Sequence, residues 1–310
     1  MWTLVAGIFM GWSLGADAAA SLFGPTVRSG AMRFWTAAIL ASIFVLIGAM
    51  TVGSGCFATY DAIGTQTLLS AFLVALAAGL TITLMAALGL PVSSTQAVVG
   101  AILGVGLLSG GVSVAPLTKI GLSWVLTPIG GLVAAYIPYK LLVLFPQALP
   151  SRLVNRVGVI RVGLVLVTCY SAYALGANNV ANVTGVFVSS GLLSPTLGAL
   201  IGALAIGLGI LTFSRRVIET VGSALVRLDA VTALIAILAE AITLNVYAVI
   251  GIPVSASQAI VGAVIGIGLV KGVKTIDGRV LLRVLFGWVG TPTIAGLLSA
   301  GLVLGARLVA

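Results

Sequence analysis

The sequence contains no histidine, only two cysteines and only six acidic residues among its 310 positions. Without histidine, the chain cannot use that side chain for acid–base catalysis, for metal ligation or as a pH switch. Cys56 and Cys169 lie far apart in apolar surroundings and form no metal-binding or redox motif. We therefore expect a protein that is not an enzyme and that holds no bound metal or cofactor.

Charged residues of both signs are also scarce, at 7% of the chain, whereas 60% of the residues are hydrophobic and the mean hydropathy is +1.28. This composition is typical of helical integral membrane proteins rather than soluble domains. Met1 leads directly into apolar sequence without a basic stretch or a cleavage site, so we expect no removable signal peptide. The net charge is +9, and the basic residues lie in short connections between apolar stretches. This distribution indicates the lipid bilayer rather than nucleic acid as a partner.

Ten apolar segments can be drawn along the chain. Their approximate ranges are 2–25, 34–53, 65–89, 92–109, 118–145, 160–188, 194–213, 229–252, 254–270 and 281–306. Several approach the ~20 residues that a helix needs to cross a bilayer. The shorter segments 92–109 and 254–270 are predicted to be either spanning helices or the returning arms of re-entrant hairpins.

The basic residues fall almost entirely in alternate connections. These connections hold Arg28, Arg33, Lys140, Arg152, Arg156, Arg161, Arg215, Arg216, Arg227, Lys271, Lys274, Arg279 and Arg283. The opposite side receives only Lys119 and Arg307. By the positive-inside rule, we expect a multi-pass protein of the cell membrane with both termini outside the cytoplasm.

Three motifs occur twice, with a separation of 161–164 residues between the copies. The matching ranges are 15–21 with 176–182, 91–96 with 253–258, and 124–128 with 288–292. Because each half has an odd number of segments, the second copy must be inverted in the membrane. We predict an all-α integral membrane protein of two inverted repeats, each with about five transmembrane or re-entrant segments. The repeats cover 1–146 and 160–310, and a basic loop over 147–159 joins them.

The Pro-Val-Ser sequence that begins at Pro91 and again at Pro253 predicts two helix starts. Proline suits the first helical turn because its missing N–H would have no partner there. The backbone N–H groups that follow lie at the positive end of a helix dipole, beside serine and threonine hydroxyls. Inside a bilayer such a start predicts an anion-binding site, since free N–H groups at that depth need a partner.

The repeated motifs resemble those of the inorganic phosphate transporter family, which includes bacterial sulfate permeases, and the resemblance covers nearly the whole chain. In that family the first motif reads Gly-Ala-Asn-Asp-Val-Ala-Asn and the second Pro-Val-Ser-Thr-Thr-His, each occurring twice. The departures are Asp17, Ala18 and Ser21 in the first copy, Asn179 in the second copy, and Gln96 and Gln258 at the histidine positions. The resemblance implies a transporter of an inorganic oxyanion. The family's sodium coupling and phosphate specificity are associated with the aspartates that are replaced here, which points to the sulfate permease branch.

The motif residues that can donate hydrogen bonds to an anion are hydroxyls and amides. The predicted substrate-binding residues are Ser93, Ser94, Thr95, Gln96, Asn178, Asn179, Asn182, Ser255, Ser257 and Gln258. Sulfate only accepts hydrogen bonds, whereas phosphate at neutral pH also carries a P–OH donor that benefits from a carboxylate. The donor-rich set favours sulfate over phosphate, with Asp17 as the residue that argues the other way.

Asp17 and Glu240 are the acidic residues expected inside the membrane, where a carboxylate costs on the order of 3 kcal/mol. No lysine or arginine lies near the central motifs in sequence, so a co-transported cation must balance the charge of the anion. We predict proton-driven symport, with Asp17 as the proton carrier and Glu240 as the second candidate. The alternatives are a sodium-coupled phosphate transporter and a passive anion channel, although no segment has the continuous polar face of a pore. The oligomeric state stays open, with a homodimer as one option.

Overall fold

The structure is a computed structural model that describes residues 2–90, 92–109, 112–145, 157–215, 228–272 and 278–309. Within these ranges the chain is helical and contains no strand. The long helices are α1 (Leu4–Leu22), α3 (Phe34–Thr51), α5 (Leu68–Ala87), α6 (Ser94–Ser109), α7 (Val114–Leu144), α9 (Val157–Ser189), α10 (Pro195–Thr212), α12 (Ala230–Ile250), α13 (Ala256–Lys271) and α14 (Gly278–Val309). Each predicted apolar segment therefore corresponds to a helix.

Three short helices in the described ranges were not predicted from the sequence. They are α2 (Gly24–Arg28), η1 (Gly53–Cys56) and α4 (Phe57–Ile63). The pair η1 and α4 fills the connection between α3 and α5, and Phe57, Tyr60 and Ile63 of α4 are buried. One face of α4 is therefore part of the protein interior.

Eight of the described helices are long and apolar enough to cross a bilayer, whereas α6 and α13 are shorter. A helix of 16 residues rises only about 24 Å, which is less than the ~30 Å hydrocarbon core. Large apolar side chains such as Leu204, Val249 and Leu297 are more than half exposed on the outside of the bundle. Such a surface suits lipid rather than water. The prediction of an all-α integral membrane protein is confirmed.

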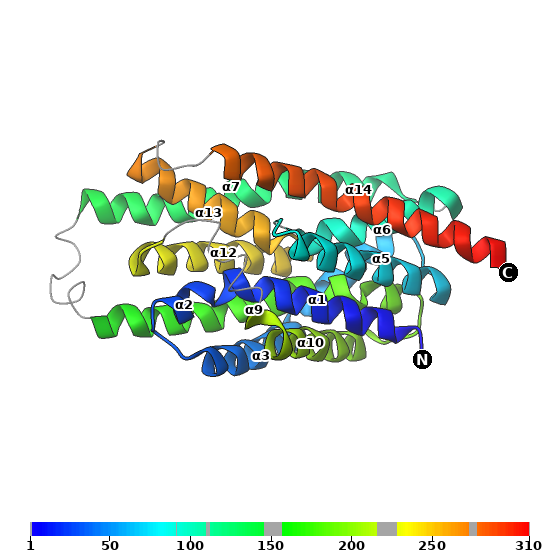
Figure 1. Cartoon of the computed structure of the whole chain (residues 1–310), viewed down its shortest axis with the longest axis horizontal. Helices are drawn as coiled ribbons and strands as arrows, with labels where there is room; N and C mark the ends of the chain where they lie inside the picture. Colours follow the sequence, from blue (N-terminus) through cyan, green and yellow to red (C-terminus); the bar gives the residue numbers. More distant parts are fainter. Residues whose placement is uncertain are drawn as a thin grey trace.

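The helices run along one long axis, and both termini lie at the same end (Figure 1). The hairpin of α5 and α6 lies toward the termini, and the hairpin of α12 and α13 lies toward the opposite end. The starts of α6 and α13 meet in the interior, where the Thr95 hydroxyl donates to the Val254 carbonyl at 2.9 Å. The structure thus brings together the two motifs that the sequence places 162 residues apart.

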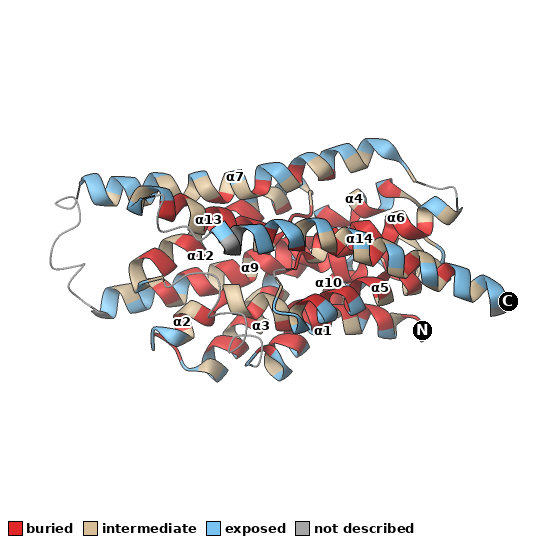
Figure 2. Cartoon of the chain, turned by 45° about the horizontal axis from the view of Figure 1, so that its top comes forward, coloured by how far each residue is buried: buried red, intermediate tan, exposed pale blue. Residues whose placement is uncertain are grey.

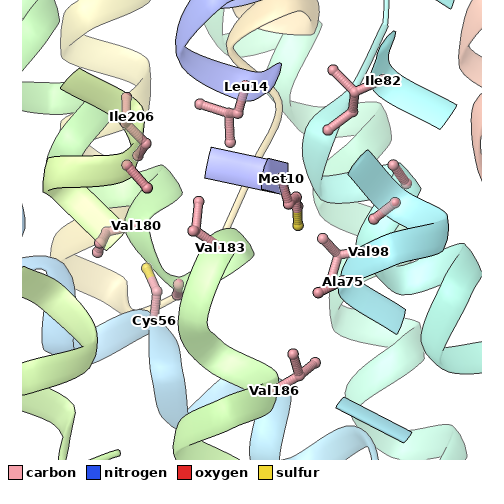
Figure 3. Packing of buried hydrophobic residues seen from close by; sticks show 14 of the residues in the cluster. Met10, Leu14, Cys56, Ala75, Ile82, Val98, Val180, Val183, Val186 and Ile206 are labelled. Carbon is pink, nitrogen blue, oxygen red and sulfur yellow. The ribbon is translucent and has the colours of Figure 1, made fainter. Parts of the chain in front are cut away.

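The buried core lies in the middle of the bundle, and the exposed faces lie on its outer helices (Figure 2). Met10 and Leu14 of α1 belong to one buried cluster with Val183 of α9 and Ile206 of α10 (Figure 3). Helices from the two halves of the sequence therefore share this buried cluster.

Two glycines at matching positions in the halves allow this close packing. Gly15 of α1 lies against the Ile206 carbonyl of α10, and Gly176 of α9 lies against the Val45 carbonyl of α3. A methyl group at either glycine would overlap with a carbonyl oxygen. The backbones can approach this closely only because glycine has no side chain.

The prediction that the Pro-Val-Ser stretches form the first helical turns is wrong for the residues that the structure describes. Helix α13 begins at Ala256, so Pro253 precedes it, and the Ser255 hydroxyl accepts from the Gln258 N–H at 3.3 Å. Helix α6 begins at Ser94, and Pro91 lies outside the described residues. Because the serine oxygen caps a free N–H of the first turn, the helix begins after the serine rather than at the proline.

The predicted loop over 147–159 is also too long, because α9 already begins at Val157. The rest of this loop, with Arg152 and Arg156, lies outside the described residues. The same is true of Arg216, Arg227 and Lys274. The end of α7 and the start of α9 lie at the end of the bundle opposite the termini (Figure 1). Lys140 belongs to the last turns of α7, and Arg161 belongs to the first turns of α9.

Candidate functional site

A small cavity of about 30 Å³ lies where the starts of α6 and α13 meet α1 and α9. The polar residues of its wall are Asp17, Ser21, Ser94, Asn179, Ser255 and Ser257. The remaining wall residues are Leu14, Ala18, Val92, Leu175 and Ala256. Both copies of each central motif therefore contribute to one interior cavity.

The start of α6 at Ser94 and the start of α13 at Ala256 are both part of the cavity wall. Each helix start carries the equivalent of about half a positive charge. Among the described residues, no lysine or arginine lines the cavity. Attraction of an anion to this cavity must therefore come from helix dipoles and from neutral hydrogen-bond donors.

Asn179 offers an unused donor on the cavity wall. Its Oδ1 atom accepts from the Ser94 hydroxyl at 3.3 Å and from Asn182 Nδ2 at 2.8 Å. Its Nδ2 atom is buried and has no hydrogen-bond partner among the described residues. A buried amide N–H normally has an acceptor, and the oxygen of a bound anion would supply one.

Asn182 lies behind the wall and positions the start of α6. Its Nδ2 atom donates to Ser94 Oγ at 3.1 Å and to Thr95 Oγ1 at 3.2 Å, and its Oδ1 atom accepts from the Tyr60 hydroxyl at 2.5 Å. Tyr60 belongs to the unpredicted helix α4 and is fully buried. No motif in the sequence identifies this tyrosine, because its partner is 122 positions away.

Asn178 likewise holds the start of α13. Its Oδ1 atom accepts from the Val254 N–H at 2.8 Å, and its Nδ2 atom donates to the carbonyls of Leu244 and Ile252 at 3.3 and 3.1 Å. The side chain thus satisfies the extended backbone between α12 and α13. Its hydrogen-bonding groups are used by the protein itself.

The other predicted substrate-binding residues also divide into residues on the cavity wall and residues behind it. Ser94, Ser255 and Ser257 are on the cavity wall, and the hydroxyls of Ser255 and Ser257 are 2.9 Å apart. Ser93 caps the first turn of α6 by accepting from the Gln96 N–H at 3.3 Å. Gln96 and Gln258 are 3% and 1% exposed and are not part of the wall.

Asp17 separates the small cavity from a larger one. The larger cavity has a volume of about 410 Å³ and is lined by Trp12, Ser13, Ala16, Asp17, Thr83, Ala86, Ala87, Leu88, Gly89 and Phe213. Asp17 therefore belongs to the walls of both cavities. This position suits a cation that has to reach the interior site.

Glu240 is fully buried on α12 and lies outside the wall of the small cavity. Its Oε2 atom accepts from the Ser171 hydroxyl at 3.5 Å, and its Oε1 atom has no partner among the described residues. Ser21, which lines the cavity, has its hydroxyl near the Glu240 carboxyl group and donates it to the Ala18 carbonyl at 3.1 Å. Glu240 is therefore one side chain away from the cavity. The described residues contain no cluster of three side chains suited to a metal ion.

Helices of bilayer length around a polar interior cavity define a multi-pass membrane protein. The model of the phosphate transporter family matches residues 14–299, and the chain belongs to that family. The resemblance that the motifs indicated is thereby confirmed at the level of the family. The family is one of transporters.

Individual relatives carry two substrate names. The "Putative phosphate permease MJ0630" of Methanocaldococcus jannaschii is 31% identical over 94% of this chain and 93% of its own length. The "Sulfate permease CysP" of Bacillus subtilis is 29% identical over 94% of this chain and 84% of its own length. A solved structure titled "The sodium-dependent phosphate transporter" has a TM-score of 0.89 over 100% of both chains at 23% identity, so it shares the fold.

Proposed function

We propose that this protein is a secondary active transporter that carries inorganic phosphate across the cell membrane together with a cation. The observation that carries the proposal is the position of Asp17, on the same cavity wall as the Asn179 amide and the serine hydroxyls. Phosphate at neutral pH has oxygens that accept hydrogen bonds from these donors, and it has a P–OH group that can donate a hydrogen bond to a carboxylate. The family and its phosphate-permease relatives support the same anion.

Sulfate, which the motif composition favours, becomes the second candidate. The Bacillus subtilis relative supports it, as do the neutral donors of the wall. Sulfate has no proton to donate, however, so an Asp17 carboxylate oxygen that does not bind the cation would be left facing an acceptor. A site discriminates strongly against a ligand that leaves one of its buried groups unpaired, so phosphate is the first candidate.

We propose sodium as the coupling ion at Asp17, with a proton as the second candidate. The two helix starts balance only about one positive charge between them, which is too little for a divalent anion at membrane depth. Carboxylate and hydroxyl oxygens of Asp17, Ser21 and Ser94 are the ligand type that hard cations prefer. The sodium-dependent transporter of the same fold supports this choice. Glu240 would serve as a second carboxyl group that acts on the cavity through Ser21.

We further propose that the halves are inverted repeats, with both termini outside the cytoplasm. The matching contacts of Gly15 with Ile206 and of Gly176 with Val45 support the repeats. The hairpins of α5–α6 and α12–α13, which lie toward opposite ends of the bundle, support the inversion (Figure 1). The basic helix ends lie away from the termini, which supports the orientation.

Uptake into proteoliposomes tests the transport proposal. Radiolabelled phosphate and sulfate are supplied separately, each with an inward sodium gradient or an inward proton gradient. We expect sodium-driven phosphate uptake that Asp17→Asn abolishes and that Asp61→Asn preserves, because Asp61 is exposed and accepts from Ser189 outside the cavity. A preference for sulfate would reassign the anion, and full uptake with a proton gradient alone would reassign the coupling ion.

A further inference from the structure

Four of the buried polar atoms without a partner form a pattern. Among the described residues, Oε1 of Gln96, Oε1 of Gln258, Nε1 of Trp124 and Nε1 of Trp288 are buried and make no hydrogen bond. An amide oxygen accepts a hydrogen bond, and an indole N–H can only donate one. The four atoms are thus two unused acceptors and two unused donors.

The helix packing places each glutamine at the level of one tryptophan. Gly100 of α6 lies against Pro292 of α14, and Gly104 lies against Gly296, so the two helices run parallel in this register. One helical turn before Gly100 and Pro292, the same register pairs Gln96 with Trp288. The unused acceptor and the unused donor therefore occupy the same level of two packed helices.

The second half shows the same arrangement. Gly262 of α13 lies against Pro128 of α7, and Gly266 lies against Leu132. One turn earlier, this register pairs Gln258 with Trp124. The two pairs lie at corresponding positions of the repeated motifs, so their unpaired state is not an isolated packing defect.

We propose that Gln96 with Trp288, and Gln258 with Trp124, are two hydrogen-bonding pairs that close when the cavity takes up its anion. Each closed pair would hold one anion-binding helix start against its neighbouring helix. This inference rests on the proposed oxyanion transport. Within it, the glutamines and tryptophans are positioning residues, because neither glutamine nor tryptophan lines the cavity.

The cavity is too small for the anion, so binding requires a movement that could also close the pairs. A cavity of about 30 Å³ has room for water but not for a tetrahedral oxyanion of five heavy atoms, so the walls must move apart on binding. Ser94, on the wall, is two residues before Gln96 in the first turn of α6. A shift of this helix start therefore moves Gln96 relative to Trp288.

The partner helices are locally loosened at the tryptophans. Pro128 and Pro292 lie inside α7 and α14, one turn after Trp124 and Trp288. Proline has no N–H, so the carbonyls of both tryptophans lack their usual helical hydrogen bond, and the helix can bend at that point. The flexible point and the unpaired indole thus coincide in both halves.

Double-mutant cycles test the pairing. Gln96→Met removes the amide group at nearly constant side-chain size, and Trp288→Phe removes the indole N–H together with part of the ring; Gln258→Met and Trp124→Phe do the same for the other pair. We expect each single variant to raise the KM for the transported anion roughly three- to tenfold, the range for one lost hydrogen bond, with little change in the maximal rate. Because the pairs are open before binding, the thermal midpoint of Gln96→Met and of Gln258→Met measured without phosphate or sulfate should stay that of the parent.

The cycle has an internal control in the choice of partners. The matched doubles, Gln96→Met with Trp288→Phe and Gln258→Met with Trp124→Phe, should raise KM no more than a single variant does. The mismatched doubles, Gln96→Met with Trp124→Phe and Gln258→Met with Trp288→Phe, should multiply the single effects. Trp35→Phe, at an indole that is 58% exposed on α3, should change nothing.

Three results would overturn the inference. The first is matched doubles whose effects multiply like those of the mismatched doubles. The second is a lower thermal midpoint of the single variants without anion together with an unchanged KM, which would show a purely structural role. The third is a parent protein that transports neither phosphate nor sulfate, which refutes the proposed function as well and so is distinct from the other two.

Discussion

The two halves of the protein build one cavity from matching backbone but with different side chains. At the third matched position of the first motif, Asp17 is on the cavity wall, whereas Asn178 binds the backbone before α13. At the last, Ser21 lines the cavity, whereas the larger Asn182 holds the start of α6. Asn178 and Asn182 of the second-half motif therefore position the helix starts, whereas Asp17 and Ser21 of the first-half motif line the cavity.

The backbone contacts that the halves share should be the most sensitive to substitution. Gly15→Ala and Gly176→Ala each place a methyl group against a carbonyl oxygen of a packed helix. We expect both variants to lose at least about 3 kcal/mol of stability, at the upper end of overpacking effects, because a helix backbone cannot move aside. Thermal unfolding followed by gel filtration measures this loss. Gly301→Ala, in open space on α14, is the control, and a strong effect in only one half would break the symmetry.

The asymmetry should appear at the matched pair Asn182 and Ser21. Asn182→Ala leaves the buried Tyr60 hydroxyl without its acceptor, at roughly 1–3 kcal/mol for a buried group left unpaired. It also removes the donor to the Ser94 and Thr95 hydroxyls, which keep their own bonds to Asn179 and Val254. Ser21→Ala removes only a bond to the Ala18 carbonyl and the interaction with Glu240, so stability should fall by no more than about 1 kcal/mol. Thermal midpoints of both variants check the order. Equal losses would mean that both motifs are structural.

The smallest expected difference in stability between the two halves lies at the helix starts of α5 and α12, outside the membrane-spanning segments. Thr67 caps α5 through a neutral side chain, and the Asp229 carboxylate caps α12 at the Val231 and Thr232 N–H groups. Partial burial would raise the pKa of Asp229, but the hydrogen bonds from Thr232 and the contact with Lys271 bring it below its ordinary value of 3.8. A lowered folded-state pKa means that this stabilisation is present above 3.8 and is lost as the pH falls through the lowered value.

Alanine at either cap should therefore cost about 1 kcal/mol at neutral pH. Below the ordinary carboxyl pKa, the difference between the parent and Asp229→Ala should shrink, whereas that for Thr67→Ala should not. The exposed contact of Asp229 with Lys271, at 2.9 Å, adds little because solvent screens it. Denaturation curves at acidic and neutral pH measure both differences, and an effect of Asp229→Ala that is constant with pH would contradict the charged cap.

The sequence allows the helices and the meeting of the repeated motifs to be predicted, because hydropathy, charge and internal repetition are visible in one dimension. It does not separate residues on the cavity wall from those behind it. Ser94 and Thr95 are neighbours of similar chemistry, yet the Thr95 hydroxyl binds the Val254 backbone and the Ser94 side chain lines the cavity. Tyr60 was missed because it lies on a short helix that the sequence did not predict, and because its partner Asn182 is distant in the sequence.

Equilibrium binding of radiolabelled phosphate to the purified protein tests the shared cavity most directly. The serines Ser94 and Ser257 come from the two different helix starts, and Ser190, which donates to the Phe187 carbonyl outside the cavity, is the control. A lost donor to a charged ligand costs about 1.5–3 kcal/mol, so Ser94→Ala and Ser257→Ala should each weaken phosphate binding roughly tenfold or more, while Ser190→Ala binds like the parent. If both cavity variants bind phosphate and sulfate with the parent's affinity, the anion site lies elsewhere.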